Sequence, residues 1–442
     1  MLSMNNDFNT AGRAVYLPAV NSTFARTAVI ADITDRPFPA GLTVNDLVYW
    51  QNNKLFSYPY LLHSIGLYKA GAVDDTAVSR IERGSAVVLG DSSGFQIGQG
   101  TLKGLEGFKA NMPALQSIAA WNAASEVRNW ILNWLESYST YAMTIDMPLW
   151  AAVENTSSPF SNCTREQLLR MTQDNLRYIN VNKQGNTKWL NVVQGIGNDD
   201  TEFWWNGVKQ YRFSGWALAG GAGSRGGLAQ LLHAVLLMNE DDAFAPGLDW
   251  VHVLGVSTLD WAVILTAVQM CLNKHNPALQ VSFDTSSPFQ SGMMREEAYY
   301  LPTLTADPRT WVFPKKESPQ GFDYIGSKEP FPHSCSPLGK LLELGHLNVS
   351  DVWDAGQRKQ YDSVSLMMLV NHDIWVTLKA IETANDLAFG DDSQTTTPRT
   401  LVDCIEHIQE VFDIAFSKGD WRGYIREHKG LFDSHSKSVY GK

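Results

Sequence analysis

Three aspartates each stand directly after an apolar run that is expected to be a buried strand: Asp91, Asp146 and Asp284. Two carboxylates facing the anomeric carbon of a sugar are what glycosidic chemistry requires. One attacks the carbon, and the other moves protons on the leaving group. A single aspartate after a strand is commonly only a turn former or a helix N-cap. The chemical interpretation therefore depends on whether these aspartates meet in one site.

The spacing of the apolar runs predicts how the aspartates are positioned. Eight short apolar runs recur, and helical patterns follow many of them. Uninterrupted apolar runs indicate strands buried on both faces, as in a parallel sheet. Eight strand–helix units of this length favour an α/β fold of the (β/α)8 TIM-barrel type. The expected strands are 15–20, 57–64, 86–90, 141–145, 189–193, 215–219, 250–254 and 279–283, and the expected helices are 113–138, 164–183, 200–212, 226–239 and 258–273.

In such a barrel the chemistry lies at the carboxyl ends of the strands. The three aspartates are then expected at one mouth, together with Gln194 and the Gly220–Gly221 pair. An additional aspartate and a glutamine can read the edge of a bound base. Glycines, and the small residues after Asp91 beginning with Ser92, allow a flat ligand to come close to the backbone.

Composition changes after the barrel. Residues 1–290 are expected to form the catalytic barrel. Residues 291–395 are rich in Pro, Ser and His and predict an irregular subdomain, and residues 396–442 predict helices packed on the barrel.

The overall composition limits the class of protein. An apolar content of 44% with 18% charged residues allows a large core and argues against global disorder. The net charge of −11 argues against a protein that coats nucleic acid generally. The four scattered cysteines indicate no disulfide framework, and no apolar run is expected to be long enough for a membrane span. A cytoplasmic protein is expected, in the host cytoplasm if a phage encodes it.

Six segments, in order, resemble motifs of the queuine tRNA-ribosyltransferases, also called tRNA-guanine transglycosylases. "GDSSGFQ" resembles their DSGGFQ motif, "TIDMP" their base-recognising aspartate motif, and "NVVQG" their strand ending in VQG. "GWALAGGAG" resembles their GYAxGGL segment, "HVLGVS" their LMGVG, and "VSFDTSS" their FDCVLPTR. Each motif alone is weak, whereas the ordered set is specific and covers about residues 85–290.

The resemblance implies a role for each matching residue. Asp284 would be the nucleophile that forms a covalent glycosyl-enzyme, and Asp91 the general acid/base. Phe95 and Leu254 would sandwich the base. Its edge would be bound by Asp146, Gln194 and the Gly221–Ala222 backbone. The implied reaction exchanges guanine for a 7-deazaguanine, such as preQ0, by double displacement without an organic cofactor.

Departures from the family concern the nucleic acid. "FDTSSPFQSG" lacks the LPTR that follows the nucleophile in the tRNA enzymes, and "GSRGG" replaces the glutamate after their GGL. The base-pocket motifs are retained, whereas the segment that reads the nucleic acid is changed. In this combination the sequence resembles the DpdA group of phage and bacterial enzymes, which place 7-deazaguanines in DNA. DNA is therefore the expected polymer. The alternatives are tRNA, an inactive nucleic-acid-binding subunit and, less favoured, a glycoside hydrolase. A homodimer or a partner protein stays open.

The Cys-x-Cys-x2-Cys zinc motif of the family is absent. "LVNHDIW" resembles the helix that carries their histidine ligand, which indicates His372, and "PHSCS" supplies His333 and Cys335, with His346 downstream. The resemblance therefore predicts a structural Zn²⁺ held by these four residues.

Two clusters interleave aromatic and basic residues, as phosphate-binding surfaces do. They are "RTWVFPKK" at 309–316 and "KGDWRGYIREHK" at 418–429. Ordinary solvated charge is an equally good interpretation of each cluster.

Overall fold

Eight parallel strands form a closed barrel in the computed structural model, which describes residues 5–69, 75–105, 107–154, 156–256, 258–352 and 361–434. The strands are β1 (Val15–Val20), β2 (Tyr60–Ser64), β3 (Val87–Asp91), β4 (Tyr141–Met143), β5 (Lys188–Gly195), β6 (Gly215–Gly220), β7 (Trp250–Val253) and β8 (Gln280–Thr285). Each strand pairs with its neighbour in sequence, and β1 pairs with β8 to close the ring. The predicted TIM barrel is confirmed, and each of the eight expected strands matches one observed strand.

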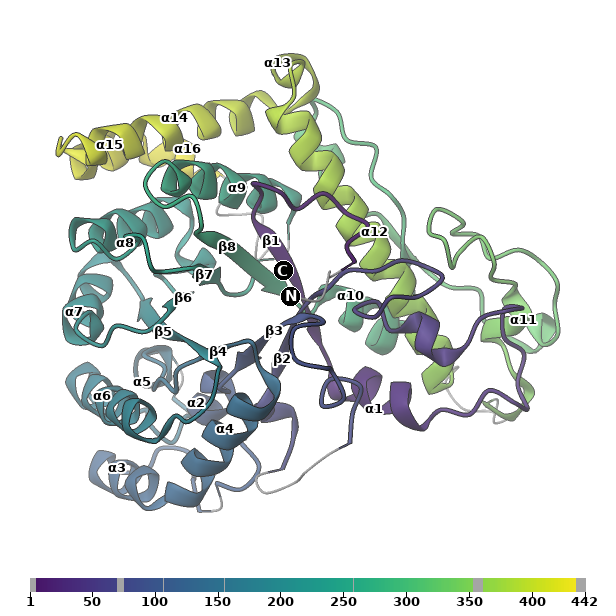
Figure 1. Cartoon of the computed structure of the whole chain (residues 1–442), viewed down its shortest axis with the longest axis horizontal. Coiled ribbons are helices and arrows are strands. Elements are labelled where there is room, and N and C mark those ends of the chain that lie inside the picture. The colour runs from purple at the N-terminus through teal and green to yellow at the C-terminus, as the bar shows by residue number, and fades with distance from the viewer. Residues whose placement is uncertain are drawn as a thin grey trace.

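Helices surround this barrel (Figure 1). They are α1 (Ser22–Ile30), α2 (Gly94–Gln99), α3 (Ala114–Ala123), α4 (Ser125–Tyr138), α5 (Trp150–Val153), α6 (Arg165–Asn182), α7 (Asn198–Val208), α8 (Leu228–Glu240) and α9 (Leu259–Asn273). The expected helix at 113–138 is two helices, because the chain leaves helical geometry at Ala124. Helix α6 begins with a capping box, in which Thr164 and Gln167 satisfy each other's backbone amides.

The first units of the barrel are irregular. Between β2 and β3 the described residues contain a short 3₁₀ turn at Ile65–Leu67 and no α-helix.

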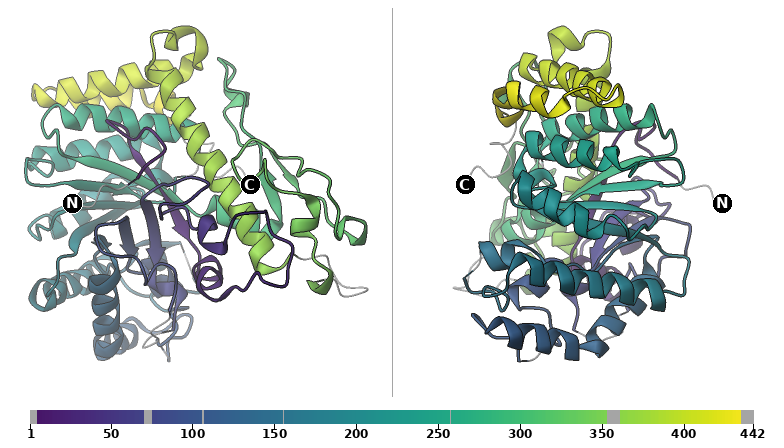
Figure 2. Two further views of the ribbon diagram at one scale, coloured as in Figure 1. Left: turned by 45° about the vertical axis from the view of Figure 1, so that its right-hand side comes forward. Right: turned by 90° about the vertical axis from the view of Figure 1, so that its left-hand side faces the viewer.

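The eighth helical position is filled by a helix that comes late in the chain. Helix α12 (Ser363–Phe389) packs against both α9 and α1, the helices on either side of the gap next to β8. Figure 2 shows it running alongside the barrel. The segment 291–395 was expected to be irregular, but its last third is this long helix. Its apolar side chains are buried because two barrel helices cover it.

Helix α12 is the one described helix whose length and composition would suit a membrane span. Of its most apolar 18-residue stretch, 78% is buried inside the protein, which is the environment of a core helix.

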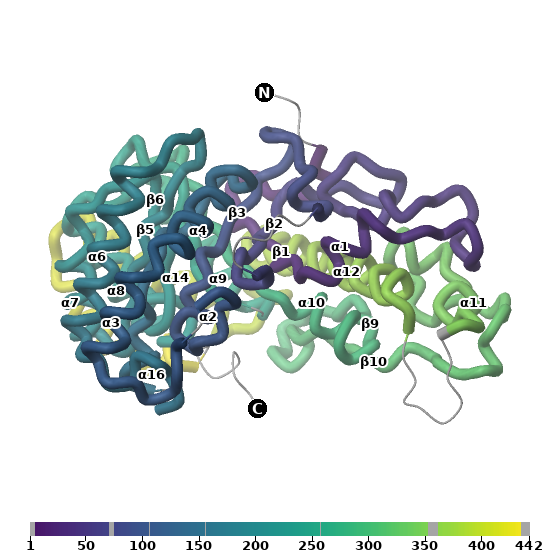
Figure 3. Tube along the Cα trace, turned by 90° about the horizontal axis from the view of Figure 1, so that it is seen from below, coloured from purple at the N-terminus to yellow at the C-terminus, as the bar shows by residue number. Residues whose placement is uncertain are grey.

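The chain between β8 and α12 makes an excursion to one side of the barrel. It contains α10 (Ser287–Phe289), a π-helical turn at Gln290–Arg295, the antiparallel pair β9 (Glu297–Tyr299) and β10 (Lys315–Glu317), and α11 (Leu344–Leu347). Figure 3 shows α11 at the end of the molecule that lies farthest from α6 and α7.

The C-terminal helices pack on the outside of the barrel. Helix α13 (Ser393–Thr396) leads into α14 (Arg399–Phe416), which lies against α9. Helices α15 (Trp421–Glu427) and α16 (Lys429–Ser434) lie against α8 (Figure 1).

Gly215 at the start of β6 offers a test of barrel packing. A Cβ there would lie 2.0 Å from the backbone oxygen of Trp250 and 2.9 Å from Leu190 Cδ2. Moving either the backbone oxygen or the packed core side chain away from the new Cβ costs free energy. We therefore expect Gly215→Ala to lower the free energy of unfolding by about 1–3 kcal/mol. Chemical denaturation measures this loss. Gly197→Ala is the control, because its Cβ meets no atom within 4 Å. Equal stability of the two variants would contradict the packing at β6.

Candidate active site

The barrel brings the predicted site residues to the same end. Asp91 is the last residue of β3, and Asp284 is the penultimate residue of β8. Asp146 follows β4, and Gln194 lies near the end of β5. Because parallel strands end at one mouth, residues from four strands face the same space.

Asp284 is held by the loop after β7. The backbone N–H of Gly255 donates to Asp284 Oδ1 at 2.9 Å, and the N–H of Val256 donates to the Asp284 backbone oxygen at 2.9 Å. Gly255 has a φ of +74°, a left-handed conformation that glycine adopts without strain. His252 Nε2 lies 3.2 Å from the same Oδ1. No role for His252 was predicted from the sequence, because a lone histidine within an apolar strand resembles a core residue.

Asp91 stands in a surrounding that favours its protonated form. Burial raises the pKa of this carboxyl, and the nearby Asp284 carboxylate adds to the rise. The Ser64 hydroxyl, the backbone N–H of Ser93 and His252 oppose it. The Ser93 N–H donates to Asp91 Oδ1 at 3.1 Å from a residue with a φ of +73°. A left-handed serine is strained, and such strain is often found at functional sites.

Asp146 forms a buried pair with Gln194. Gln194 Nε2 donates to Asp146 Oδ2 at 2.9 Å and to the Met147 backbone oxygen at 3.1 Å. Gln194 Oε1 accepts from the Leu149 N–H at 2.7 Å. Both amide hydrogens of Gln194 are thus committed inside the protein. As placed here, Gln194 orients Asp146 and the loop after β4.

The pKa of Asp146 is raised to about 7, first by burial and then by the charge of Asp91. Its other oxygen, Oδ1, faces a glycine, because a Cβ on Gly94 would lie 2.8 Å from it. A carboxyl that titrates near neutral pH can accept or donate hydrogen bonds to the edge of a base.

A cavity of about 100 Å³ opens beside this pair. It is lined by Trp150, Glu154, Gln194, Gly195, Ile196, Gly220, Gly221, Arg225 and Gly226. The predicted glycine pair is therefore part of its wall. A Cβ on Gly221 would lie 2.7 Å from the backbone oxygens of Gly195 and Ile196, so the chain ends of β5 and β6 meet closely only with glycine there. An ion pair between Arg225 and Glu154, 2.6 Å long, closes one side.

Two aromatic rings stand near the cavity. Phe95, in the first turn of α2, is 63% exposed, and its ring centroid lies 5.5 Å from that of Trp150. An exposed aromatic pair beside a glycine-lined cavity is suited to stacking on a flat ligand. Trp150 was not singled out in the sequence, although it follows Asp146 by only four residues. Leu254, the proposed second face, lies directly after β7 and is partly exposed.

The remaining predicted base-site residues are mainly structural in their contacts. Ser92 is buried, and its hydroxyl donates to the Thr144 backbone oxygen at 2.9 Å, which joins the ends of β3 and β4. The Gly221 N–H donates to the Gly195 oxygen at 2.5 Å. The Ala222 side chain is fully buried.

The four predicted zinc ligands do not assemble. Within the described ranges, no group of three or more His, Cys, Asp or Glu side chains is arranged to hold a metal ion. His372 Nδ1 is bonded to Ser336 Oγ at 2.7 Å and Nε2 to the Tyr299 backbone oxygen at 2.8 Å. His346 Nδ1 accepts from the Glu343 N–H. Among the four, His333 has no hydrogen-bond partner for either ring nitrogen, whereas backbone N–H groups including that of Leu301 bond the sulfur of Cys335. This geometry does not fit zinc, and the presence of zinc stays a prediction.

Most cations of the two basic clusters already have partners. Arg309 pairs with Asp307 at 2.6 Å and Lys315 with Glu297 at 2.9 Å. Arg422 pairs with Glu240 at 2.6 Å, at the last residue of α8. Because α8 begins at the mouth and ends at the opposite face, this contact places the start of the C-terminal cluster away from the candidate site.

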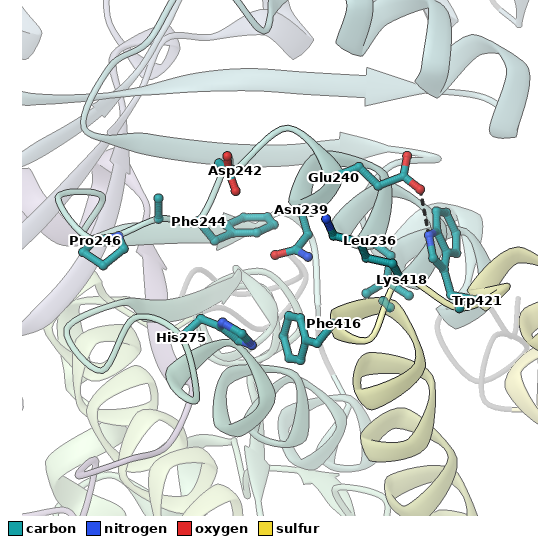
Figure 4. Close-up of a pocket in the computed structure, with 13 residues that line it drawn as sticks. Leu236, Asn239, Glu240, Asp242, Phe244, Pro246, His275, Phe416, Lys418 and Trp421 are labelled. Carbon is teal, nitrogen blue, oxygen red and sulfur yellow. Dashed lines mark hydrogen bonds between the residues drawn. The ribbon is translucent and has the colours of Figure 1, made fainter.

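A larger cavity, about 570 Å³, lies at that opposite face between α8, the end of α9 and the start of α15 (Figure 4). Phe244, His275, Phe416 and Trp421 contribute its rings. Its Glu240 carboxylate already binds the Trp421 indole N–H and Arg422. Lys418 and Trp421 of the second basic cluster line this cavity, but none of the residues predicted for catalysis, base binding or zinc does.

No family model matches the chain, and no curated protein is significantly similar to it in sequence. The assignment of a function therefore depends on the geometry of the mouth and on the motif resemblance.

The raised pKa of Asp146 predicts a pH-dependent stability. Between about pH 4 and 7 the folded protein keeps a proton that the unfolded chain releases, so the contribution of Asp146 to stability falls as pH rises through this window. We expect Asp146→Asn to gain stability relative to the wild type between pH 4.5 and pH 8. Denaturation curves at both pH values measure the difference, with the exposed Asp35→Asn as control. A difference that is independent of pH would contradict the buried, raised carboxyl.

Proposed function

We propose that this chain is a transglycosylase that exchanges guanine in DNA for a 7-deazaguanine base. The observation that carries the proposal is the pair of carboxylates, Asp91 and Asp284, at one mouth of the barrel. They lie close enough for the Asp284 charge to raise the pKa of Asp91. Their different surroundings support different roles. Asp284 Oδ1 accepts the Gly255 N–H and lies 3.2 Å from His252 Nε2, whereas burial favours a proton on Asp91.

Together, these two roles support a double-displacement reaction. An Asp284 carboxylate oxygen attacks C1′ of the target deoxyribose, and the bond from C1′ to guanine breaks while Asp91 delivers a proton to the leaving base. The Asp91 carboxylate then takes a proton from the incoming base, whose nitrogen attacks C1′ and releases Asp284. No oxidant, reductant or energy source is needed, because one glycosidic bond replaces another.

The base-binding features support a purine-like substrate. The guanine edge carries two neighbouring N–H donors. A carboxylate such as Asp146 can accept a hydrogen bond from each of them at the same time. Four glycines contribute backbone to the cavity wall, and Phe95 with Trp150 offers aromatic surface for stacking. A base must leave its helix to reach such a site, and aromatic surfaces stabilise flipped bases.

The turn after Asp284 supports DNA over tRNA. Thr285 Oγ1 and Ser287 Oγ are bonded to each other at 2.8 Å, and Pro288 follows in α10. The tRNA enzymes that the sequence resembles carry an arginine here. Hydroxyl groups that satisfy each other cannot replace the paired hydrogen bonds of a guanidinium group.

The polymer is tested with radiolabelled guanine, duplex DNA and tRNA at matched salt. We expect label to enter DNA, at a rate at least tenfold above that for tRNA, and to fall steeply with added salt because phosphate contacts release counterions. Faster labelling of tRNA would make the chain a tRNA enzyme. Labelling of neither polymer, with DNA still bound, would instead favour an inactive binding subunit.

The two carboxylates are tested by Asp284→Ala and Asp91→Asn. The first should abolish exchange, because no group remains to form the covalent adduct, which the wild type should show on denaturing gels. The second should lower turnover by about 10²–10⁴-fold, because an amide cannot shuttle a proton. Exposed Asp35→Ala is the control, and thermal melting checks each fold. Wild-type exchange by Asp284→Ala would refute the nucleophile.

A further inference from the structure

A row of hydrogen bonds behind Asp284 runs through two strands. Trp250 Nε1 donates to Ser282 Oγ at 2.7 Å, His252 Nδ1 lies 2.9 Å from the same oxygen, and His252 Nε2 lies 3.2 Å from Asp284 Oδ1. The register places His252 beside Ser282 on the paired strands β7 and β8. The His252 and Ser282 side chains are fully buried, and Trp250 is 6% exposed.

The chemistry of these groups favours one direction for each hydrogen bond. An indole N–H can only donate, so Ser282 Oγ accepts from Trp250 and keeps its own hydrogen for another acceptor. The nearest acceptor is His252 Nδ1 at 2.9 Å, because the Val251 backbone oxygen lies 3.5 Å away. With this direction, His252 carries its proton on Nε2 and donates it to Asp284. An ionised carboxylate accepts only, which is consistent with this direction.

The two oxygens of Asp284 are therefore unequal. Both His252 Nε2–H and the Gly255 N–H converge on Oδ1. Across the described residues, no hydrogen bond or ion pair reaches Oδ2. Oδ1 is held in place, while Oδ2 keeps its lone pairs for a reaction.

We propose that His252, set in its Nε2–H tautomer by Ser282 and Trp250, is a positioning residue that presents Asp284 Oδ2 as the attacking oxygen. This inference rests on the proposed function, in which Asp284 is the nucleophile. When Oδ2 bonds to C1′, Oδ1 becomes the carbonyl oxygen of the ester. The same two N–H groups then stabilise the negative charge that returns to the carboxylate as the second base displaces it.

The tautomer is tested first, without any substrate. Nitrogen-15 NMR of histidine-labelled protein separates the two ring nitrogens, and the His252 signal is identified by its loss in His252→Gln. In the wild type we expect one tautomer, with the proton on Nε2. In Ser282→Ala we expect a mixture of tautomers, because the hydrogen bond from Ser282 to Nδ1 is missing. A wild-type His252 that carries its proton on Nδ1 would overturn the proposal.

The positioning role is tested by kinetics of guanine exchange. His252→Phe keeps a ring but removes the donor, and we expect kcat to fall about 10–100-fold, the range for a hydrogen bond to a charged group, with KM changed by less than about threefold. His252→Gln can still donate and should recover part of kcat. His63→Gln is the matched control, since His63 is also fully buried on a barrel strand but bonds Val20 and Tyr68.

Failure of this inference and failure of the proposed function give different results. An active wild type whose His252→Phe and Ser282→Ala variants both keep wild-type kcat would overturn the role of His252 and leave the transglycosylase assignment intact. An inactive wild type that still shows the expected tautomer would overturn the proposed function. It would also overturn the role of His252 in catalysis. If His252→Phe fails to fold, Ser282→Ala carries the kinetic test, because it leaves Asp284 and His252 in place.

Discussion

Pairing of β1 with β8 is the contact on which the rest of the molecule depends. Residues Val15 to Pro18 lie in register with Ser282 to Thr285, which joins the start of the barrel to its end. Without this pairing, β3 and β8 would be distant strands of an open sheet, and Asp91 and Asp284 would not share a mouth. Closure also leaves the barrel without an exposed strand edge.

That closure creates an electrostatic cost at the mouth. Burial raises the pKa values of Asp91 and Asp146, and each is raised further by another carboxylate of the group. Groups of like charge in a water-poor site oppose folding, so the apolar core must offset them. A site of this kind is prepared before any ligand arrives, because hydrogen bonds from Gln194, Gly255 and His252 already hold two of the carboxylates.

The sequence was sufficient for the barrel and for the positions of the aspartates, because buried parallel strands appear as uninterrupted apolar runs. It was not sufficient for His252, whose significance depends on its register beside Ser282 on a strand about thirty residues later. Helix α12 was obscured by the Pro-rich stretch before it, and its place in the barrel depends on packing against α1 and α9. The zinc prediction relied on analogy, and His372 instead satisfies both ring nitrogens within the protein.

The late position of α12 has a consequence for synthesis on the ribosome. All eight strands have been made once Thr285 is reached, yet the helix that covers the gap between α1 and α9 begins only at Ser363. Until that helix emerges, a nascent chain holds a complete set of strands with an uncovered apolar flank. Such a flank favours non-native association, as incomplete domains commonly do. The excursion between β8 and α12 therefore lengthens the interval in which the growing chain is most exposed to aggregation.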